Sequence, residues 1–515
     1  MPLPPSWALA SLATIAEINP RSFCILPAAA QLSVHFVPMS AVREEFGGID
    51  ASLSRPLADV QKGYTSFLAN DVLFAKITPC MENGKLAIVP SLPHQIAFGS
   101  TEFHVLRATS ATYPAWLAYF LSQTQFRKFA RQNMTGSAGQ MRVATTWLSS
   151  TSIPVAPIAE QARILEKLAE LLSDLDAGVA ELKAAQKKLL RYRQSLLKAA
   201  VDGTLTAAWR ETQRQQQDEP QETGAQLLER ILSERRVRWE AKQLARFSEQ
   251  GKAPHKHWKA RYPEPTQPDS SKLPELPDGW VWTSIGHCFQ VVVGATPSRK
   301  QSSYWNGDIP WVSSGEVRFS RISETKERIT EIGLKNSSTQ INPIGSVMLG
   351  MIGEGKTRGQ VAILDIPAAN NQNCAAIWVS ETDVPPEYVY CWLWSRYDQT
   401  RKGSSGNNQP ALNKSIIEAI PLPLPPLAEL NAIVRLLGSS FEQISDQEAA
   451  VELALKQTAA QRQNILKAAF SGQLVPQDPS DEPATVLLER IRAERTAAGA
   501  GVGIGKRGRK TRGQS

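Results

Sequence analysis

The chain has 515 residues, of which 42% are hydrophobic and 21% are charged. This length suits about three to four domains, and the composition is that of a folded globular protein, which excludes a largely disordered chain. Neither a membrane-spanning apolar run nor the basic start of a signal peptide is present, so a membrane or secreted protein is not indicated. The five cysteines lie far apart without a C-x-x-C pair, which favours a reducing cytoplasm over a disulfide or zinc framework.

The net charge of +8 is distributed unevenly. The last 18 residues contain five Lys and Arg and no acid, which leaves +3 for the rest of the chain. If DNA is the partner, affinity must therefore come from locally arranged cations, because only cations placed at phosphates release counterions.

Residues 1–152 are predicted to form a first mixed α/β globule. Short apolar runs at 71–75 and 86–89 are bounded by Gly, Pro and Asn, as strands are. A helical pattern follows near residues 114–130.

A first helical region is predicted over residues 153–250. It opens on a Pro-rich segment at 153–157, and Gly203 ends its long helix. About 42 helical residues at roughly 1.5 Å each make a rod of order 60 Å. A shorter amphipathic helix is expected around 227–235, followed by a polar linker at 251–275.

The second half of the chain repeats this order. A second α/β globule is predicted at 276–419, with strands at 347–349, 361–364 and 375–379 and a helix at 386–397. A second helical region follows at 420–497, in which Gly472 ends the long helix, and then a basic, disordered tail at 498–515.

An internal repeat relates the two long helices. A shift of 269 positions aligns residues 140–203 with 409–472 without a gap, and apolar residues step by three and four in the same phase in both. We expect the two helices to pair antiparallel within one chain, although heptad helices also pair between chains. The residues expected to pair them are Leu168, Leu172, Leu175, Val179, Leu182, Leu437, Phe441, Ile444, Val451 and Leu455.

One segment matches a phosphate-binding loop on paper. Residues 350–357 satisfy G-x-x-x-x-G-K-T, with Lys356 and Thr357 at its end. Such a loop needs a helix to open at these two residues, whereas a glycine and a β-branched run follow. A hairpin turn is the better interpretation, and an ATP-hydrolysing enzyme stays as an alternative.

Other catalytic and metal motifs give no support. The G-x-G-x-x-G at 503–508 lies in the Gly- and Arg-rich tail without a preceding strand, and the six histidines show no metal-ligand spacing. No catalytic site, metal site or cofactor is predicted for this chain.

Two loops suit the recognition of a polymer. Residues 135–142 and 403–410, one ahead of each long helix, combine Gly and Ser with Gln or Asn. Gln and Asn present a bidentate donor and acceptor to adenine, and Gly and Ser let the backbone approach phosphates. Loops of this composition are also common as ordinary flexible connections.

Taken together, these features resemble the specificity subunit of a type I restriction-modification system. Leu-Pro-Asp-Gly-Trp at 276–280, Gly-Ala-Thr-Pro-Ser at 294–298 and the segment 304–311 are similar to the family's target-recognition domain. Residues 98–104 resemble another family motif. The Pro-Ile/Leu-Ala-Glu helix starts and Leu-Lys-Ala-Ala helix ends are similar to its repeated helical regions. The chain departs from the pattern at Ala295, at Leu430, and in the first globule, where Trp7 alone stands for the opening motif.

The resemblance implies a non-catalytic DNA-specificity subunit. Each globule would read one half of a split target, and the paired helices, related by a pseudo-two-fold axis, would set the spacer. Two methyltransferase subunits and restriction subunits would dock around the chain, and S-adenosylmethionine, ATP and Mg²⁺ would act on those partners. A coiled-coil adaptor without DNA binding is the remaining alternative. The residues expected to contact DNA are Lys76, Lys85, Ser100, Thr101, Ser137, Gly139, Gln140, Arg142, Lys356, Arg358, Ser404, Ser405, Asn407, Asn408 and Gln409.

Overall fold

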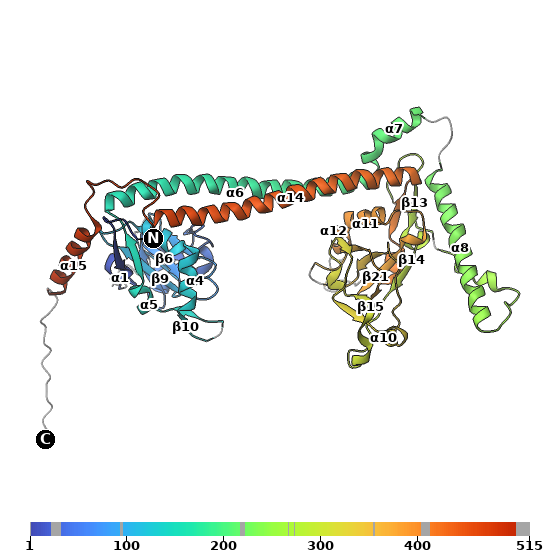
Figure 1. Cartoon of the computed structure of the whole chain (residues 1–515), viewed down its shortest axis with the longest axis horizontal. Helices are drawn as coiled ribbons and strands as arrows, with labels where there is room; N and C mark the ends of the chain where they lie inside the picture. The colour runs from blue at the N-terminus through green and yellow to red at the C-terminus, as the bar shows by residue number, and fades with distance from the viewer. Residues whose placement is uncertain are drawn as a thin grey trace, which may run out of the picture. The chain divides into compact units, whose positions relative to one another are not determined.

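The Pro-rich segments ahead of the long helices are β-strands in the computed structural model. β12 (Ser152–Val155) leads into helix α6 (Ile158–Val201), and β22 (Pro421–Leu424) leads into α14 (Leu427–Ala469) (Figure 1). Shortly after each helix stands a glycine in the left-handed region, Gly203 with φ 79° and Gly472 with φ 73°, as is common at helix C-termini. The two predicted helices and their ends are confirmed.

The structure describes residues 2–21, 32–92, 96–137, 139–216, 222–265, 267–271, 273–353, 356–402 and 412–500, with side chains described as far as residue 494. The predicted basic tail and the loop at 403–411 lie mostly or wholly outside these ranges.

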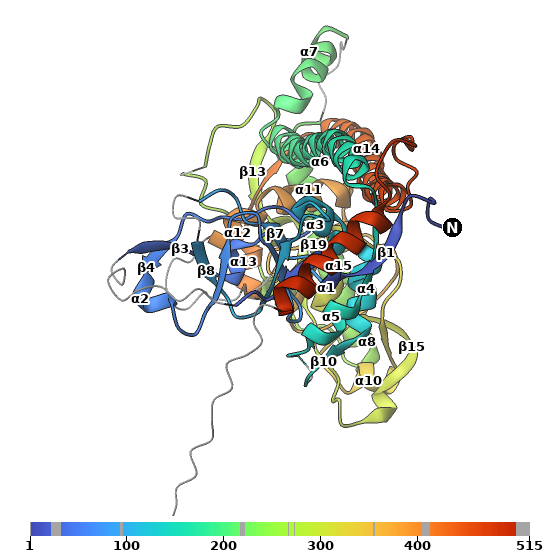
Figure 2. The ribbon, with the colours of Figure 1, turned by 90° about the vertical axis from the view of Figure 1, so that its left-hand side faces the viewer.

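Contacts divide the chain into two compact units. The first unit is Met1–Lys183 with Glu452–Ser515, and the second is Ala184–Val451. Each long helix therefore contributes to both units, so the contact units do not follow the predicted domain boundaries, which stay a prediction. Within the first unit, an ion pair of 2.5 Å joins Asp176 of α6 to Arg462 of α14, and the two helices lie side by side and antiparallel (Figures 1 and 2).

Among its described residues, the first unit has two four-stranded sheets and two two-stranded sheets. One four-stranded sheet has the order β2-β9-β6-β7 and the other β4-β3-β8-β5, while β1 pairs with β12 and β10 with β11. Their bounds are β1 (Ala8–Ser11), β2 (Ala16–Ile18), β3 (Ser33–Val37), β4 (Ser54–Pro56), β5 (Thr65–Leu68), β6 (Val72–Ala75), β7 (Leu86–Ile88), β8 (Ile96–Gly99), β9 (Phe103–Ala108), β10 (Met134–Thr135) and β11 (Arg142–Val143). The helices are α1 (Leu12–Ile15), α2 (Leu57–Val60), α3 (Pro114–Ser122), α4 (Thr124–Gln132), α5 (Thr145–Ser150) and α15 (Ala484–Ala500).

The long helices complete the core of the first unit. Leu168 and Leu172 of α6 are buried together with Leu466 of α14 and Trp116 of α3. The indole of Trp116 lies 4.5 Å from the ring of Phe470, which follows α14. Burial of such side chains is worth about 1.5–3 kcal/mol each, so the globule and the helices stabilise one another.

The second unit has a five-stranded sheet of order β14-β21-β18-β19-β16, a three-stranded sheet β17-β15-β20, and the pair β13-β22. Its strands are β13 (Val281–Ser284), β14 (Gln290–Val293), β15 (Trp305–Val312), β16 (Ser320–Ile322), β17 (Glu327–Ile329), β18 (Val347–Gly350), β19 (Val361–Leu364), β20 (Ala369–Asn370) and β21 (Cys374–Trp378). Its helices are α7 (Ala207–Gln216), α8 (Gly224–Glu249), α9 (Ile285–Cys288), α10 (Glu331–Lys335), α11 (Pro386–Ser395), α12 (Tyr397–Lys402) and α13 (Lys414–Glu418).

The second core is built in the same way. Leu197 and Ala200 of α6 and Leu430 and Leu437 of α14 are buried against the globule. Arg193 of α6 lies 2.8 Å from Glu448 of α14, which pairs the two helices within this unit. Mixed α/β globules combined with two long helices confirm the predicted fold class, and the predicted strands are present within a residue or two of their expected bounds. The helical pattern at 114–130 is divided into α3 and α4, and the helix expected around 227–235 is longer, since α8 ends at Glu249.

Candidate nucleic-acid interface

Three loops of the first globule meet at one place. The amide of Lys76, after β6, donates to Glu102 O at 2.9 Å, and Lys76 O accepts from Val143 N of β11 at 2.8 Å. Thr78 N donates to Met141 O at 3.0 Å. The backbone therefore joins the β6–β7 loop, the β8–β9 loop and the β10–β11 hairpin, which together carry most of the predicted contact residues of this unit.

An ion pair fixes two of these loops. Arg142 of β11 donates through Nε and Nη2 to the two carboxylate oxygens of Glu102, both at 2.9 Å. The hydrogen bond from Arg142 holds the pKa of Glu102 below its usual value. Bidentate pairs of this kind add geometric specificity, so Arg142 serves here to hold the loops. Its predicted contact with DNA stays a prediction.

A buried histidine lies beneath the same loops. His104 of β9 is 1% exposed, and its Nε2 lies 2.8 Å from Val143 O. Its Nδ1 lies 3.1 Å from the side-chain amide nitrogen of Asn19, which favours a neutral ring that donates from Nε2 and accepts at Nδ1. Burial lowers the pKa of His104 in agreement with that assignment. Glu102, His104 and Asn19 were missed as site residues from the sequence.

The tip of the β10–β11 hairpin is exposed. Ser137, Gly139 and Gln140 are exposed, as is Thr101 in the neighbouring loop, while Ser100 is half-buried. Gln140 N donates to Ser137 O at 3.0 Å, a turn in which Gly139 has φ 81°. Gln140 is therefore exposed in the β10–β11 connection, and its amide is held by Ser137 O.

The side chain of Lys85 is held by a backbone carbonyl, and its predicted contact with DNA stays a prediction. Its ammonium donates to Met39 O at 3.0 Å, and the side chain is half-buried. A lysine held by a backbone carbonyl is a poorer phosphate ligand than a solvated one, so this hydrogen bond argues against a contact between Lys85 and a DNA phosphate.

Residues 350–357, which match the phosphate-binding motif, connect two antiparallel strands of the second unit. β18 and β19 pair antiparallel, Val347 opposite Ile363, and Lys356 and Thr357 lie in turns of the connection between them. The described residues after Thr357 lead into strand β19, so the helix that a phosphate-binding loop needs does not begin at Lys356 and Thr357. The alternative of an ATPase built on this motif is not supported.

Two predicted cations of this hairpin differ in exposure. Lys356 is exposed, and its carbonyl accepts from the Tyr397 hydroxyl at 2.7 Å. Arg358 is 6% exposed and donates to Arg401 O at 3.2 Å, which argues against a phosphate contact. The predicted contact residues Ser404, Ser405, Asn407, Asn408 and Gln409 lie outside the described residues.

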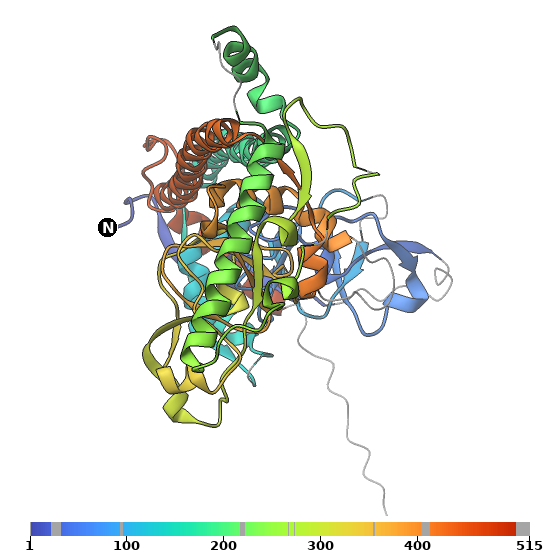
Figure 3. The ribbon, with the colours of Figure 1, turned by 90° about the vertical axis from the view of Figure 1, so that its right-hand side faces the viewer.

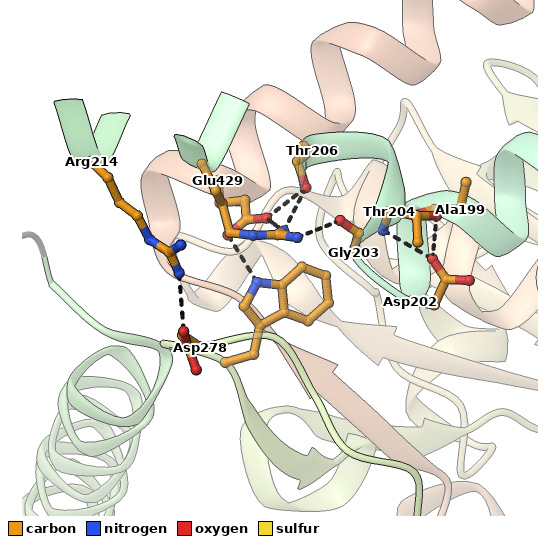
Figure 4. Close-up of polar contacts among 10 residues, drawn as sticks. Ala199, Asp202, Gly203, Thr204, Thr206, Arg214, Asp278 and Glu429 are labelled. Carbon is orange, nitrogen blue, oxygen red and sulfur yellow. Dashed lines mark hydrogen bonds and ion pairs between the residues drawn. The ribbon is translucent and has the colours of Figure 1, made fainter. Parts of the chain in front are cut away.

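A buried glutamate joins the second globule to both long helices. Glu429 of α14 is 1% exposed and accepts from Trp280 Nε1 at 2.8 Å and from Thr206 Oγ at 2.5 Å (Figure 4). Arg210 of α7 forms an ion pair with the same carboxylate and donates to Gly203 O at 2.7 Å. This contact ties the start of the globule to the end of α6 and the start of α14.

The first unit repeats this contact with other partners. Glu160 of α6 accepts from Trp7 Nε1 at 3.0 Å and from the Gln477 amide at 2.6 Å. Burial raises the pKa of Glu160, opposed by these two hydrogen bonds. Trp7 N donates to Pro4 O as Trp280 N does to Pro277 O. Trp7 is thus the structural counterpart of Trp280 although the motif around it differs.

The predicted helix-pairing residues divide into two groups. Some pack in the globular cores as well as along the helices, and the others are half-buried on the helix surface. Leu168, Leu172, Leu437 and Ile444 are buried, and Leu175, Val179, Leu182, Phe441, Val451 and Leu455 are half-buried.

Metal, thiol and membrane features add nothing to the site. Over the residues that the structure describes, no cluster of three or more His, Cys, Asp or Glu has metal-site geometry. Cys80, Cys288, Cys374 and Cys391 are free thiols. Within the same described part, the helices are too short or too polar to cross a membrane.

Comparison with known proteins agrees with the resemblance found in the sequence. Residues 277–453 match the family described as "Type I restriction modification DNA specificity domain". The chain is similar to the "Type I restriction enzyme EcoAI specificity subunit" of Escherichia coli, at 26% identity over 84% of this chain and 77% of the relative. It is also similar to the "Type I restriction enzyme EcoEI specificity subunit" of Escherichia coli, at 25% identity over 85% and 78%. The chain is thus similar to type I restriction-modification specificity subunits over most of its length, and residues 277–453 match their family model.

A solved structure is similar to this chain in fold. A chain from the work titled "Structural basis underlying complex assembly and conformational transition of the type I R-M system" is similar with a TM-score of 0.65. It covers 92% of this chain and 100% of that chain at 19% identity. The alternation of globules with long helices is thus shared with it.

Proposed function

We propose that this chain is the specificity subunit of a type I restriction-modification system, that it reads the base sequence of duplex DNA, and that it contains no catalytic centre of its own. Each globule reads one half of a split target, and α6 and α14 set the spacer between the halves. Methyltransferase subunits, two in number, and restriction subunits assemble on it in the cytoplasm. S-adenosylmethionine, ATP and Mg²⁺ are used by those partners, where the family places the chemistry.

The observation that carries this proposal is the ordered loop cluster of the first globule. Backbone hydrogen bonds and the Arg142–Glu102 pair join loops that are far apart in the sequence, and an exposed Gln140 stands at their tip. A Gln carboxamide reads adenine through two hydrogen bonds, and this needs a fixed direction of approach. Small exposed residues beside it let the backbone come close to DNA.

Selection of bound duplexes from a random pool tests the proposal. We expect the full chain to enrich a target made of two short sequences separated by a gap. Gln140→Ala should relax discrimination at one base pair by about 1–3 kcal/mol. The matched control is Gln125→Ala, at an exposed glutamine of α4 in the same unit, and it should leave the discrimination between base pairs unchanged. A chain that binds random and selected duplexes equally would exclude sequence reading.

The spacer function has a separate test. Insertion of four residues at matching places in α6 and α14 lengthens each helix by about 6 Å. We expect the gap in the selected target to grow while both half-sites stay the same. A changed half-site with an unchanged gap would contradict the assignment of spacing to the helices.

A further inference from the structure

The positive charge of the chain is concentrated in one short segment of the second unit. Residues 235–261 contain nine Lys and Arg and two Glu, a net charge of +7. The last 18 residues carry +5, so with a total of +8 the rest of the chain sums to −4. The strongest charge signal of the described residues therefore lies outside the loops considered so far.

This segment forms a built element, which we name the α8 arm (residues 224–262). The start of α8 is fixed on the globule: Gly224 N donates to Gly279 O at 2.7 Å, and Leu227 and Ile231 are buried in the core. Further along, Arg235 donates to Gly286 O at 2.6 Å. Figure 1 and Figure 3 show α8 running along the second unit from this attachment.

The chain then folds back and is clasped to α8 by aromatic side chains. Trp258 stacks on Trp239 with ring centroids 5.9 Å apart and planes at 20°, and Tyr262 meets Trp239 edge-on at 5.3 Å. Phe247 contacts the same Trp258 at 6.1 Å. These aromatic residues are half-buried, so they hold the arm together and are not offered to a partner.

The cations of the arm fall into two sets. One set is paired with carboxylates, as Arg238 is with Glu234 and Lys259 with Glu240. The second set is exposed and, within the part of the chain that the structure describes, lies in no ion pair. It consists of Lys242, Arg246, Lys252, Lys256 and Arg261.

We propose that the α8 arm binds the phosphate backbone of duplex DNA independently of sequence, as a second contact beside the base-reading loops. The exposed set is rich in Lys, a residue that is depleted at protein interfaces but attracted to phosphates. The aromatic rings of the arm are half-buried, and the large apolar side chains exposed on α8 are Val237 and Leu244, residue types that are under-represented among the anchors of protein interfaces. The choice of DNA as the ligand rests on the proposed function.

The test compares two triple variants of the full chain. Lys242→Gln/Lys252→Gln/Lys256→Gln removes three cations of the arm, and Lys183→Gln/Lys187→Gln/Lys188→Gln removes three exposed cations of α6 as the matched control. Binding of a 30-base-pair selected duplex and of a random duplex of equal length is measured by fluorescence anisotropy between about 50 and 200 mM KCl.

Three lost phosphate contacts reduce the slope of log K against log[salt] by about 2.7, because each contributes about 0.9. Across this fourfold salt range the arm variant should therefore lose about 40-fold less affinity than the wild type. Affinity at low salt should fall for both duplexes alike, and the ratio between them should stay unchanged. The α6 variant should keep the wild-type slope.

The outcomes separate this inference from the proposed function. An arm variant with the wild-type salt slope, or one no different from the α6 variant, would overturn the inference even if the target is still preferred. Absence of target preference in the wild type would instead refute the proposed function, whatever the slope. Trp258→Ala, which releases the clasp, should lower the slope in the same direction, with thermal unfolding as the check on folding.

Discussion

Arg210→Met is the most informative single change in the contact between the second globule and the long helices. The carboxylate of Glu429 is 1% exposed, and the Arg210 guanidinium that neutralises it is 18% exposed. The variant leaves a buried charge with only the neutral donors Trp280 and Thr206 among the contacts described above. Removal of one partner from a buried ion pair costs about 3 kcal/mol or more.

That loss is large enough to measure in the intact chain. For a unit of this size, each kcal/mol lowers Tm by about 2–4 °C, so calorimetry should show the second unit unfolding about 6–12 °C earlier. Arg214→Met is the control, because its partner Asp278 is 91% exposed and surface pairs contribute at most about 1 kcal/mol (Figure 4). Arg210→Met combined with Glu429→Gln should recover part of the loss. If Arg210→Met shifts Tm no more than Arg214→Met, the buried pair does not stabilise this contact.

Changes at Glu160, Arg142 and Gly203 test three other parts of the structure. Because burial raises the pKa of Glu160, the stability that this carboxyl contributes is present at low pH and lost as pH rises past that pKa. In urea unfolding, the free energy of unfolding of Glu160→Gln relative to the wild type should therefore be higher at pH about 7 than at pH about 4. Arg142→Ala should raise the NMR-measured pKa of Glu102 toward its ordinary 4.5, and the stability that this carboxylate adds above that pH should shrink. Gly203→Ala should lower stability by about 1–3 kcal/mol in thermal unfolding, because φ is 79° and the new Cβ would lie 2.5 Å from Pro277 Cγ; unchanged stability would exclude strain at this turn.

The long helices were predictable because their signal is periodic and repeated. The 269-residue shift, the Pro-rich entries and Gly203 and Gly472 define both helices within a few residues. Alternating and apolar runs likewise located strands such as β6 and β19. The apolar positions of the long helices were predicted to pack helix against helix, yet Leu168 and Leu437 also pack in the globular cores. A heptad pattern shows which face of a helix is apolar, but it does not show which element packs against that face.

The loop cluster was only partly predictable. The hairpin with Gln140 was located by its composition, but Glu102, His104 and Asn19 act through contacts across 40 or more positions, which no periodicity marks.

The structure of the α8 arm was also only partly predictable. Residues 251–275 were predicted as a polar linker, whereas Trp258 to Arg261 form a short 3₁₀ helix clasped to α8. The aromatic residues in this otherwise polar segment were the available signal.

The pairing of β1 with β12 and of β13 with β22 has an evolutionary consequence. Ala8 faces Val155 and Val281 faces Leu424, so each globule begins and ends on adjacent strands, and the second strand of each pair leads into a long helix. A gene segment that encodes everything between such a pair forms an exchangeable cassette with a single graft point. Recombination within the paired strands would then install a new recognition head while the helical scaffold keeps its own sequence.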